Sequence, residues 1–149
     1  MAHDDLERLA LTGQAEDYLK AIYELERHGE SAGTNDIAAR LGIAPASVTG
    51  MVQRLARLGL ASTERYKGAR LTDAGRAAAL QLIRRHRIIE SYLVQRLGYT
   101  VDDVHDEAER LEHAASDDLI ERMAAAIGNP TEDPHGTPIP APRAGERET

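Results

Sequence analysis

Four side chains that can bind a divalent cation recur at helical spacing near the middle of the second half of the chain: His105, Glu109, Glu112 and His113. Positions i, i+4, i+7 and i+8 share one side of a helix. An earlier pair at i and i+4, His86 and Glu90, repeats the pattern. Imidazoles and carboxylates without sulfur suit Mn²⁺ or Fe²⁺. Salt-bridged helix faces in solvent show the same spacing, so the pattern alone favours neither reading, and His135 belongs to no such pattern.

The elements that must position these side chains are mostly helices. Apolar residues recur with helical period in six segments, near residues 13–27, 35–41, 45–58, 73–97, 101–114 and 116–128. Thr34 is expected to cap the second helix and Pro45 to open the third, while a short β-hairpin is expected over residues 60–71. Residues 129–149 hold five of the six prolines and predict a tail or linker. The predicted fold class is mainly α.

Composition excludes several classes of protein. The 149 residues include no cysteine, which excludes a disulfide framework, a thiolate zinc site and cysteine catalysis. There is no apolar run long enough to cross a membrane and no visible secretory signal, so we expect a cytoplasmic protein. The formal net charge is −7, yet residues 40–76 hold seven basic and two acidic side chains, a local charge of +5. Such a basic segment can bind phosphate groups within an acidic chain.

The basic segment has the order of a winged helix-turn-helix: a helix, a three-residue turn, a second helix and a basic hairpin. We expect the second helix and the hairpin to contact double-stranded DNA through the outward residues Ala46, Ser47, Thr49, Gly50, Gln53, Arg54, Arg57, Arg65, Lys67 and Arg70. Small and hydroxylic side chains can approach base edges, and basic ones can reach phosphates. A polar helix face in solvent is the alternative, and the turn, Pro45 and the basic hairpin together favour DNA.

Three segments resemble the diphtheria-toxin-repressor (DtxR/MntR) family of metal-dependent transcriptional repressors: Glu-Asp-Tyr-Leu-Lys-Ala-Ile-Tyr-Glu-Leu at 16–25, Arg-Arg-His-Arg at 84–87 and Val-His-Asp-Glu-Ala-Glu-Arg-Leu-Glu-His at 104–113. The resemblance covers about residues 12–140. It implies an N-terminal winged helix-turn-helix domain at 1–76, a helical metal-binding and dimerisation domain at 77–140 and a flexible tail at 141–149. It also implies a homodimer that binds palindromic operator DNA, and no enzymatic activity.

The resemblance further implies two sets of metal ligands. The primary site would consist of Asp17, Glu109, Glu112 and His113, and the ancillary site of His86, Glu90 and His105. Iron-type members have methionine in place of Asp17 and cysteine in place of Glu109, so the resemblance favours Mn²⁺ as the regulatory metal, with Fe²⁺ next. Manganese-type members with a closely spaced binuclear cluster have glutamate in place of Lys20. This departure favours two separated sites.

Two further questions stay open in the sequence. The apolar residues Ile88, Ile89, Tyr92, Leu93 and Leu97 could form the dimer contact or the core of the monomer. The function expected is a metal-activated repressor of metal-ion uptake genes, and the alternative is a winged-helix regulator that senses a small organic ligand. A carboxylate-bridged dimetal enzyme is disfavoured, because that class needs Glu-x-x-His motifs on two helices and no predicted helix carries one.

Overall fold

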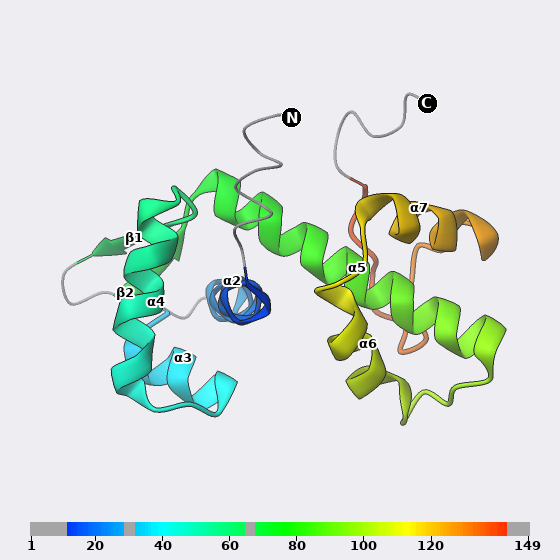
Figure 1. The fold of residues 1–149 in the computed structure, drawn as a ribbon, viewed down its shortest axis with the longest axis horizontal. Coiled ribbons are helices and arrows are strands. Elements are labelled where there is room, and N and C mark those ends of the chain that lie inside the picture. The colour runs from blue at the N-terminus through cyan, green and yellow to red at the C-terminus, as the bar shows by residue number, and fades with distance from the viewer. Residues whose placement is uncertain (1–11, 29–31, 65–67, 143–149) are drawn as a thin grey trace. The chain divides into compact units, whose positions relative to one another are not determined.

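The computed structural model describes residues 12–28, 32–64 and 68–142 of the chain. The chain divides into two compact units, Met1–Ala79 and Leu80–Thr149, and helices are the main elements of both (Figure 1). The predicted mainly α fold class is therefore confirmed. None of the helices in the described ranges has the length and apolar character that crossing a membrane requires.

The first unit begins with three helices: α2 (Gly13–Arg27), α3 (Thr34–Leu41) and α4 (Pro45–Arg57). Thr12 caps α2, because its hydroxyl accepts the Ala15 N–H at 3.1 Å. Gly42 ends α3 in the left-handed conformation at φ +67°, and Pro45 opens α4 as predicted. The predicted cap at Thr34 is wrong. Gly33 takes the cap position without a side-chain hydrogen bond, and Thr34 is already the first helical residue.

A two-stranded antiparallel hairpin follows α4. Strands β1 (Ala61–Glu64) and β2 (Gly68–Leu71) pair with Ala61 opposite Leu71. The other edge of β2 is held by Ala32, whose carbonyl accepts the Ala69 N–H at 2.8 Å. Gly68 lies at φ +79°, and a Cβ there would stand 2.4 Å from the Ala32 oxygen, so only glycine fits this close approach. With the turn between α3 and α4, the hairpin completes a winged helix-turn-helix.

Helix α5 (Asp73–Leu97) starts in the first unit and continues into the second. Thr72 caps it, since its hydroxyl accepts the Gly75 N–H at 3.1 Å. The second unit adds α6 (Val104–Glu112) and α7 (Asp117–Ala126), and Ser116 caps α7 through the Leu119 N–H at 3.1 Å. Helix α6 begins three residues later than the predicted start at 101, after a turn over residues 101–103.

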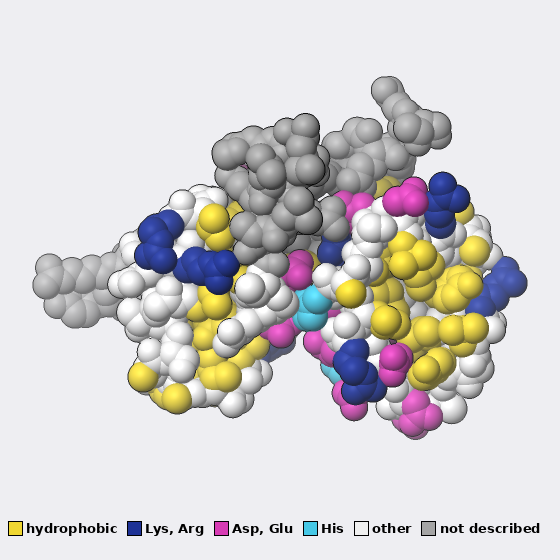
Figure 2. Space-filling model, viewed as in Figure 1, with side chains coloured by type: hydrophobic (Ala, Val, Ile, Leu, Met, Phe, Trp, Pro, Cys, Tyr) yellow, Lys and Arg dark blue, Asp and Glu magenta, His cyan; other side chains and the backbone are white. Residues whose placement is uncertain are grey.

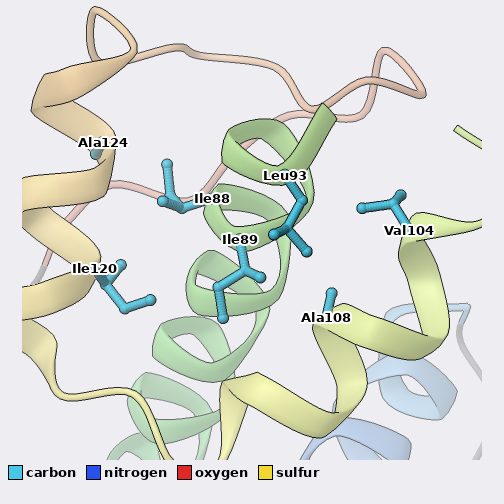
Figure 3. Packing of buried hydrophobic residues seen from close by; sticks show 7 residues of the cluster. All are labelled: Ile88, Ile89, Leu93, Val104, Ala108, Ile120 and Ala124. Atoms are coloured by element: carbon cyan, nitrogen blue, oxygen red, sulfur yellow. The ribbon is translucent and has the colours of Figure 1, made fainter. Parts of the chain in front are cut away.

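Buried side chains from α5, α6 and α7 form the core of the second unit (Figure 3): Ile88, Ile89, Leu93, Val104, Ala108, Ile120 and Ala124. Burying a side chain the size of isoleucine contributes about 1.5–3 kcal/mol. The core therefore fixes α5 against α6, which are the two helices that carry the predicted metal ligands of this unit.

The chain after α7 is not the tail or linker that its prolines predict. Residues 130–142 pack on the second unit, where Arg84 donates to the Pro140 carbonyl at 2.9 Å and Ile139 lies against the core. Within this segment the Asp133 N–H donates to the Thr137 carbonyl at 2.9 Å and the Ile139 N–H to the Thr131 carbonyl at 2.8 Å. The spacing of the prolines correctly indicates that this segment is not helical. Its fixed path over the second unit comes from these tertiary contacts, which the spacing does not encode. Of the flexible tail predicted at 141–149, residues 143–149 lie outside the described ranges.

Candidate metal centres and nucleic-acid interface

Helix α4 presents an exposed polar face opposite a buried one. Its buried side chains are Val48, Val52 and Leu55. Of the residues predicted to contact DNA, this helix exposes Ala46, Ser47, Thr49, Gly50, Gln53 and Arg57, while Arg54 is half-buried. A Cβ added at Gly50 would meet none of the described residues within 4 Å, so none of them covers the backbone there. Small side chains in the first turns and Arg57 at the end can approach base edges and phosphates respectively.

The hairpin is anchored from α2. Glu26 lies at the C-terminal end of α2 and its Oε1 accepts the Leu71 N–H of β2 at 2.8 Å. Arg70, a predicted DNA contact on the same strand, is exposed. Arg65 and Lys67, the other two predicted contacts of the hairpin, lie outside the described residues. The sequence pattern around Glu26 does not predict this hydrogen bond, because its partner Leu71 is 45 residues away.

In the second unit, His86 lies at the centre of a group of titratable side chains. Its Nε2 is 3.1 Å from Glu90 Oε1 and 3.2 Å from His105 Nδ1. Its Nδ1 faces two carboxylates of α6, at 3.8 Å from Glu109 Oε1 and 3.6 Å from Glu112 Oε1. The structure therefore brings together the three residues predicted for the ancillary site and places two residues of the predicted primary site beside them.

The charges of this group shift the pKa of His86. Burial by itself lowers that pKa, but the carboxylates of Glu112 and Glu90 outweigh burial and raise it to about 9 from 6.5. Burial raises the pKa of Glu90, and the positive His86 overcomes this effect and lowers it. In the metal-free protein at neutral pH, His86 is an imidazolium among carboxylates.

The end of α6 carries the remaining ligands that were predicted for the primary site in this unit. Glu109, Glu112 and His113 each offer a ligand atom, and these atoms lie within 4.8 Å of one another. Glu112 is fully buried, whereas Glu109 and His113 are half-buried. Glu109 also lies within 4.8 Å of ligand atoms of His86 and His105. Asp17, the fourth predicted ligand, lies on α2 of the first unit and is half-buried.

A further group was missed in the sequence. Glu90, Asp133 and His135 offer ligand atoms within 4.8 Å of one another. His135 Nδ1 is 3.8 Å from Glu90 Oε2 and 3.9 Å from Asp133 Oδ2, whereas His86 contacts the other oxygen of Glu90, Oε1. Asp133 Oδ1 accepts the His135 and Thr137 N–H groups at 2.9 and 2.8 Å, which fixes the loop that presents His135. The Asp-Pro-His-Gly turn at 133–136 is the only local signal that could have indicated this group.

The donors of these groups fit a divalent cation. They are imidazole nitrogens and carboxylate oxygens, the ligands that Mn²⁺ and Fe²⁺ accept in proteins. Two of the atoms, His86 Nδ1 and Glu90 Oε2, are buried and have no hydrogen-bond partner among the residues that the structure describes. A buried polar atom without a partner costs about 1–3 kcal/mol, and coordination removes that cost.

An apolar groove of about 310 Å³ lies on the second unit, whose visible face gathers exposed hydrophobic side chains (Figure 2). The groove is lined by α5, α6 and α7, through Ile89, Tyr92, Leu93, Leu97, Leu111, Ala114, Ala115, Leu119 and Met123. Leu97 and Leu119 are 59% and 47% exposed. Of the residues considered for a dimer contact, Ile88, Ile89 and Leu93 belong to the core of the unit itself, although Ile89 and Leu93 also line the groove with Tyr92 and Leu97.

Comparison with known proteins matches both units to one family. The family described as "Iron dependent repressor, N-terminal DNA binding domain" matches residues 10–69. The family described as "Iron dependent repressor, metal binding and dimerisation domain" matches residues 72–141.

Individual relatives agree with this match. The iron-dependent repressor IdeR of Mycobacterium tuberculosis is 38% identical over 130 residues, which are 87% of this chain and 56% of IdeR, so the chain spans little more than half of that relative. The uncharacterized HTH-type transcriptional regulator MJ0568 of Methanocaldococcus jannaschii is 38% identical over 72% of this chain and 87% of its own length. The structure of the manganese regulator SloR superposes with a TM-score of 0.77 at 39% identity, covering 85% of this chain and 59% of SloR. The chain belongs to the DtxR/MntR family of metal-dependent transcriptional repressors.

Proposed function

We propose that this chain is a transcriptional repressor whose affinity for operator DNA depends on a bound divalent cation. Residues 1–76 serve as the DNA-binding domain and residues 77–140 as the metal-binding and dimerisation domain. The observation that carries the proposal is the buried His86 with carboxylates on both of its ring nitrogens, in a chain that also holds a winged helix-turn-helix. A repressor of metal-uptake genes needs both parts.

The residues proposed to hold the cation fall into two centres. In the first, Glu109, Glu112 and His113 act together with Asp17, which is included on the sequence resemblance alone. In the second, His86, Glu90 and His105 are joined by Asp133 and His135, which lie beside Glu90. A bound cation supplies the positive charge that these carboxylates need in order to lie together. Two carboxylates about 4 Å apart repel by about 1 kcal/mol in water and by more near a protein surface.

Mn²⁺ is the preferred cation in this proposal, with Fe²⁺ next. Asp17 and Glu109 are both carboxylates at positions where the resemblance places methionine and cysteine in iron-type members. The relative SloR is named a manganese regulator, whereas IdeR is named iron-dependent, so relatives of both kinds lie at similar identity. The chain has no cysteine, and neither proposed centre includes a methionine, which supports the harder cation.

The proposed DNA complex contains two copies of the chain. The apolar groove of α5, α6 and α7 is the proposed contact between copies, because Leu97 and Leu119 would otherwise expose large apolar side chains to water. Two winged helices related by a two-fold axis match a palindromic operator. Cation binding then favours the DNA-competent state only as far as the cation binds that state more tightly.

The test is a DNA-binding titration on the promoter of the gene that encodes this chain. Affinity is measured in chelator, Mn²⁺, Fe²⁺ and Zn²⁺ for the wild type, Glu112→Gln, Asp17→Ala and the exposed control Asp102→Ala. We expect the wild type and the control to bind tightly only with metal. Glu112→Gln and Asp17→Ala should bind in metal as weakly as the wild type does in chelator.

Equal binding of the wild type in chelator and in Mn²⁺ would contradict metal activation and favour a regulator that senses an organic ligand. A higher affinity in Fe²⁺ than in Mn²⁺ at equal free concentration would contradict the proposed preference alone. Loss of DNA binding in Asp102→Ala would show that removal of any acidic side chain weakens DNA binding. The results for Glu112→Gln and Asp17→Ala would then no longer support a metal centre.

A further inference from the structure

A buried arginine joins the three helices of the second unit at the end of α6. The guanidinium of Arg85 on α5 donates to Asp117 Oδ1 through Nε at 3.2 Å and Nη2 at 2.7 Å. Its Nη1 lies 3.4 Å from the backbone carbonyl oxygen of Glu112. The side chain of Arg85 is 6% exposed. One rigid fork of donors thus holds the first residue of α7 and the last residue of α6.

These two contacts bracket the connection that follows the candidate ligand Glu112 and begins with the candidate ligand His113. Glu112 ends α6 and His113 is its C-cap, so the carbonyls there lie beyond the regular hydrogen bonds of the helix. A positive group at this end of a helix is favoured by the helix dipole. On the other side, Ser116 caps α7 and Asp117 starts it. Residues 113–116 therefore run between two points that Arg85 fixes.

We propose that Arg85 is a positioning residue for the metal centre. It holds the connection between α6 and α7 so that the side chains of Glu112 and His113 keep their places before a cation binds. Partners that orient metal ligands in this way typically change metal affinity by about 10–100-fold when they are replaced. Lysine keeps the charge of Arg85 but lacks the planar fork, so it cannot hold both acceptors. The inference rests on the proposed function, because it presupposes a metal centre at Glu112 and His113.

The neighbouring Arg84 provides a matched control. It is also buried, and it makes a two-point contact with Glu121 of α7, at 3.0 Å through Nε and 2.7 Å through Nη2. Its third hydrogen bond reaches the Pro140 carbonyl. Within the described residues, none of its hydrogen bonds reaches α6. Arg84→Lys and Arg85→Lys therefore remove similar buried contacts from the same turn of α5, but only Arg85→Lys frees the end of α6.

The experiment compares Arg84→Lys and Arg85→Lys, each made in a full-length parent chain that carries His135→Ala. The His135→Ala change removes the exposed imidazole of the second centre, so that Mn²⁺ binding reports on the first. Mn²⁺ affinity is measured by competition with a fluorescent chelator, and melting temperature in EDTA. Amide hydrogen exchange at residues 113–116 is measured in EDTA as well. We expect Arg85→Lys to weaken Mn²⁺ binding about 10–100-fold and to speed this exchange. Arg84→Lys should lower the melting temperature similarly, yet change Mn²⁺ affinity by no more than about twofold.

Equal Mn²⁺ affinities of the two variants, or equal exchange at 113–116, would overturn the positioning role of Arg85. If Arg85→Lys does not fold, Asp117→Asn tests the same contact from α7, and an unchanged Mn²⁺ affinity in that variant overturns the role as well. Glu112→Gln separates this failure from a failure of the proposed function. If Glu112→Gln binds Mn²⁺ as tightly as the parent chain, there is no metal centre at Glu112 and both ideas are wrong.

Discussion

Raising the pH should destabilise the metal-free protein, because the positive charge within its acidic cluster is a proton on His86. The pKa of His86 is raised from 6.5 to about 9 by Glu112 and Glu90, against the effect of burial. A basic group whose pKa is higher in the folded state stabilises that state fully below its unfolded pKa. This stabilisation is lost as the pH rises from about 6.5 through about 9.

The size of the effect follows from the two pKa values. The difference between 6.5 and about 9, at about 1.36 kcal/mol for each pH unit, corresponds to about 3 kcal/mol. The His86 side chain is 10% exposed, so solvent screens little of this interaction. A loss of about 3 kcal/mol is a large part of the stability of a small domain.

Urea denaturation followed by circular dichroism in EDTA measures this loss at pH 6.5, 7.5, 8.5 and 9.5. The wild type should lose stability steadily over this range, and His86→Gln should lose about 3 kcal/mol less than the wild type does. The control His28→Gln removes an exposed histidine of the first unit and should follow the wild type. Parallel pH curves for the wild type and His86→Gln would refute the reasoning.

Three further perturbations test other parts of the molecule. Gly68→Ala forces a Cβ against the Ala32 oxygen at positive φ, and should lower stability by about 1–3 kcal/mol or more in thermal melts, whereas an unchanged melting temperature would contradict that close approach. Leu119→Glu places a charge in the apolar groove and should shift the chain from dimer to monomer in sedimentation velocity with unchanged circular dichroism. An unaltered mass would exclude the groove as the contact. His135→Ala should reduce the Mn²⁺ bound per chain from two to one in calorimetry, and a stoichiometry equal to the wild type would show that the second centre does not use His135.

Local patterns in the sequence were sufficient to predict most helices and the residues at which they begin and end. Pro45, Thr72 and Ser116 stand at the helix starts that their chemistry predicts, because a cap acts within three or four residues of itself. The prediction that Thr34 is the N-cap was wrong, because local patterns did not distinguish it from its neighbour. Gly33 and Thr34 can both begin a helix, and the choice of Gly33 comes without any side-chain hydrogen bond that the sequence could signal.

Helical periodicity alone predicted the candidate site only where its residues share a helix, and the pairing of His86 on α5 with His105 on α6 came from the family resemblance. His105 and Glu109 lie one turn apart on α6, so their proximity follows from helical geometry. His135 and Asp133 reach Glu90 only because residues 130–142 fold back on α5, and no periodicity encodes that return. Arg85 was likewise not identified, since its partners Glu112 and Asp117 come from two other helices.

The raised pKa of His86 changes the expected role of a cation in this family member. Repulsion among carboxylates is partly offset in the metal-free state, because the imidazolium already lies 3.6 Å from Glu112. His86 must lose its proton before either ring nitrogen coordinates, so cation binding should release about one more proton from the wild type than from His86→Gln at pH 7.5. Calorimetry in two buffers of different ionisation enthalpy counts these protons. If both proteins release the same number, His86 keeps its proton and acts as a charge beside the centre instead of as a ligand.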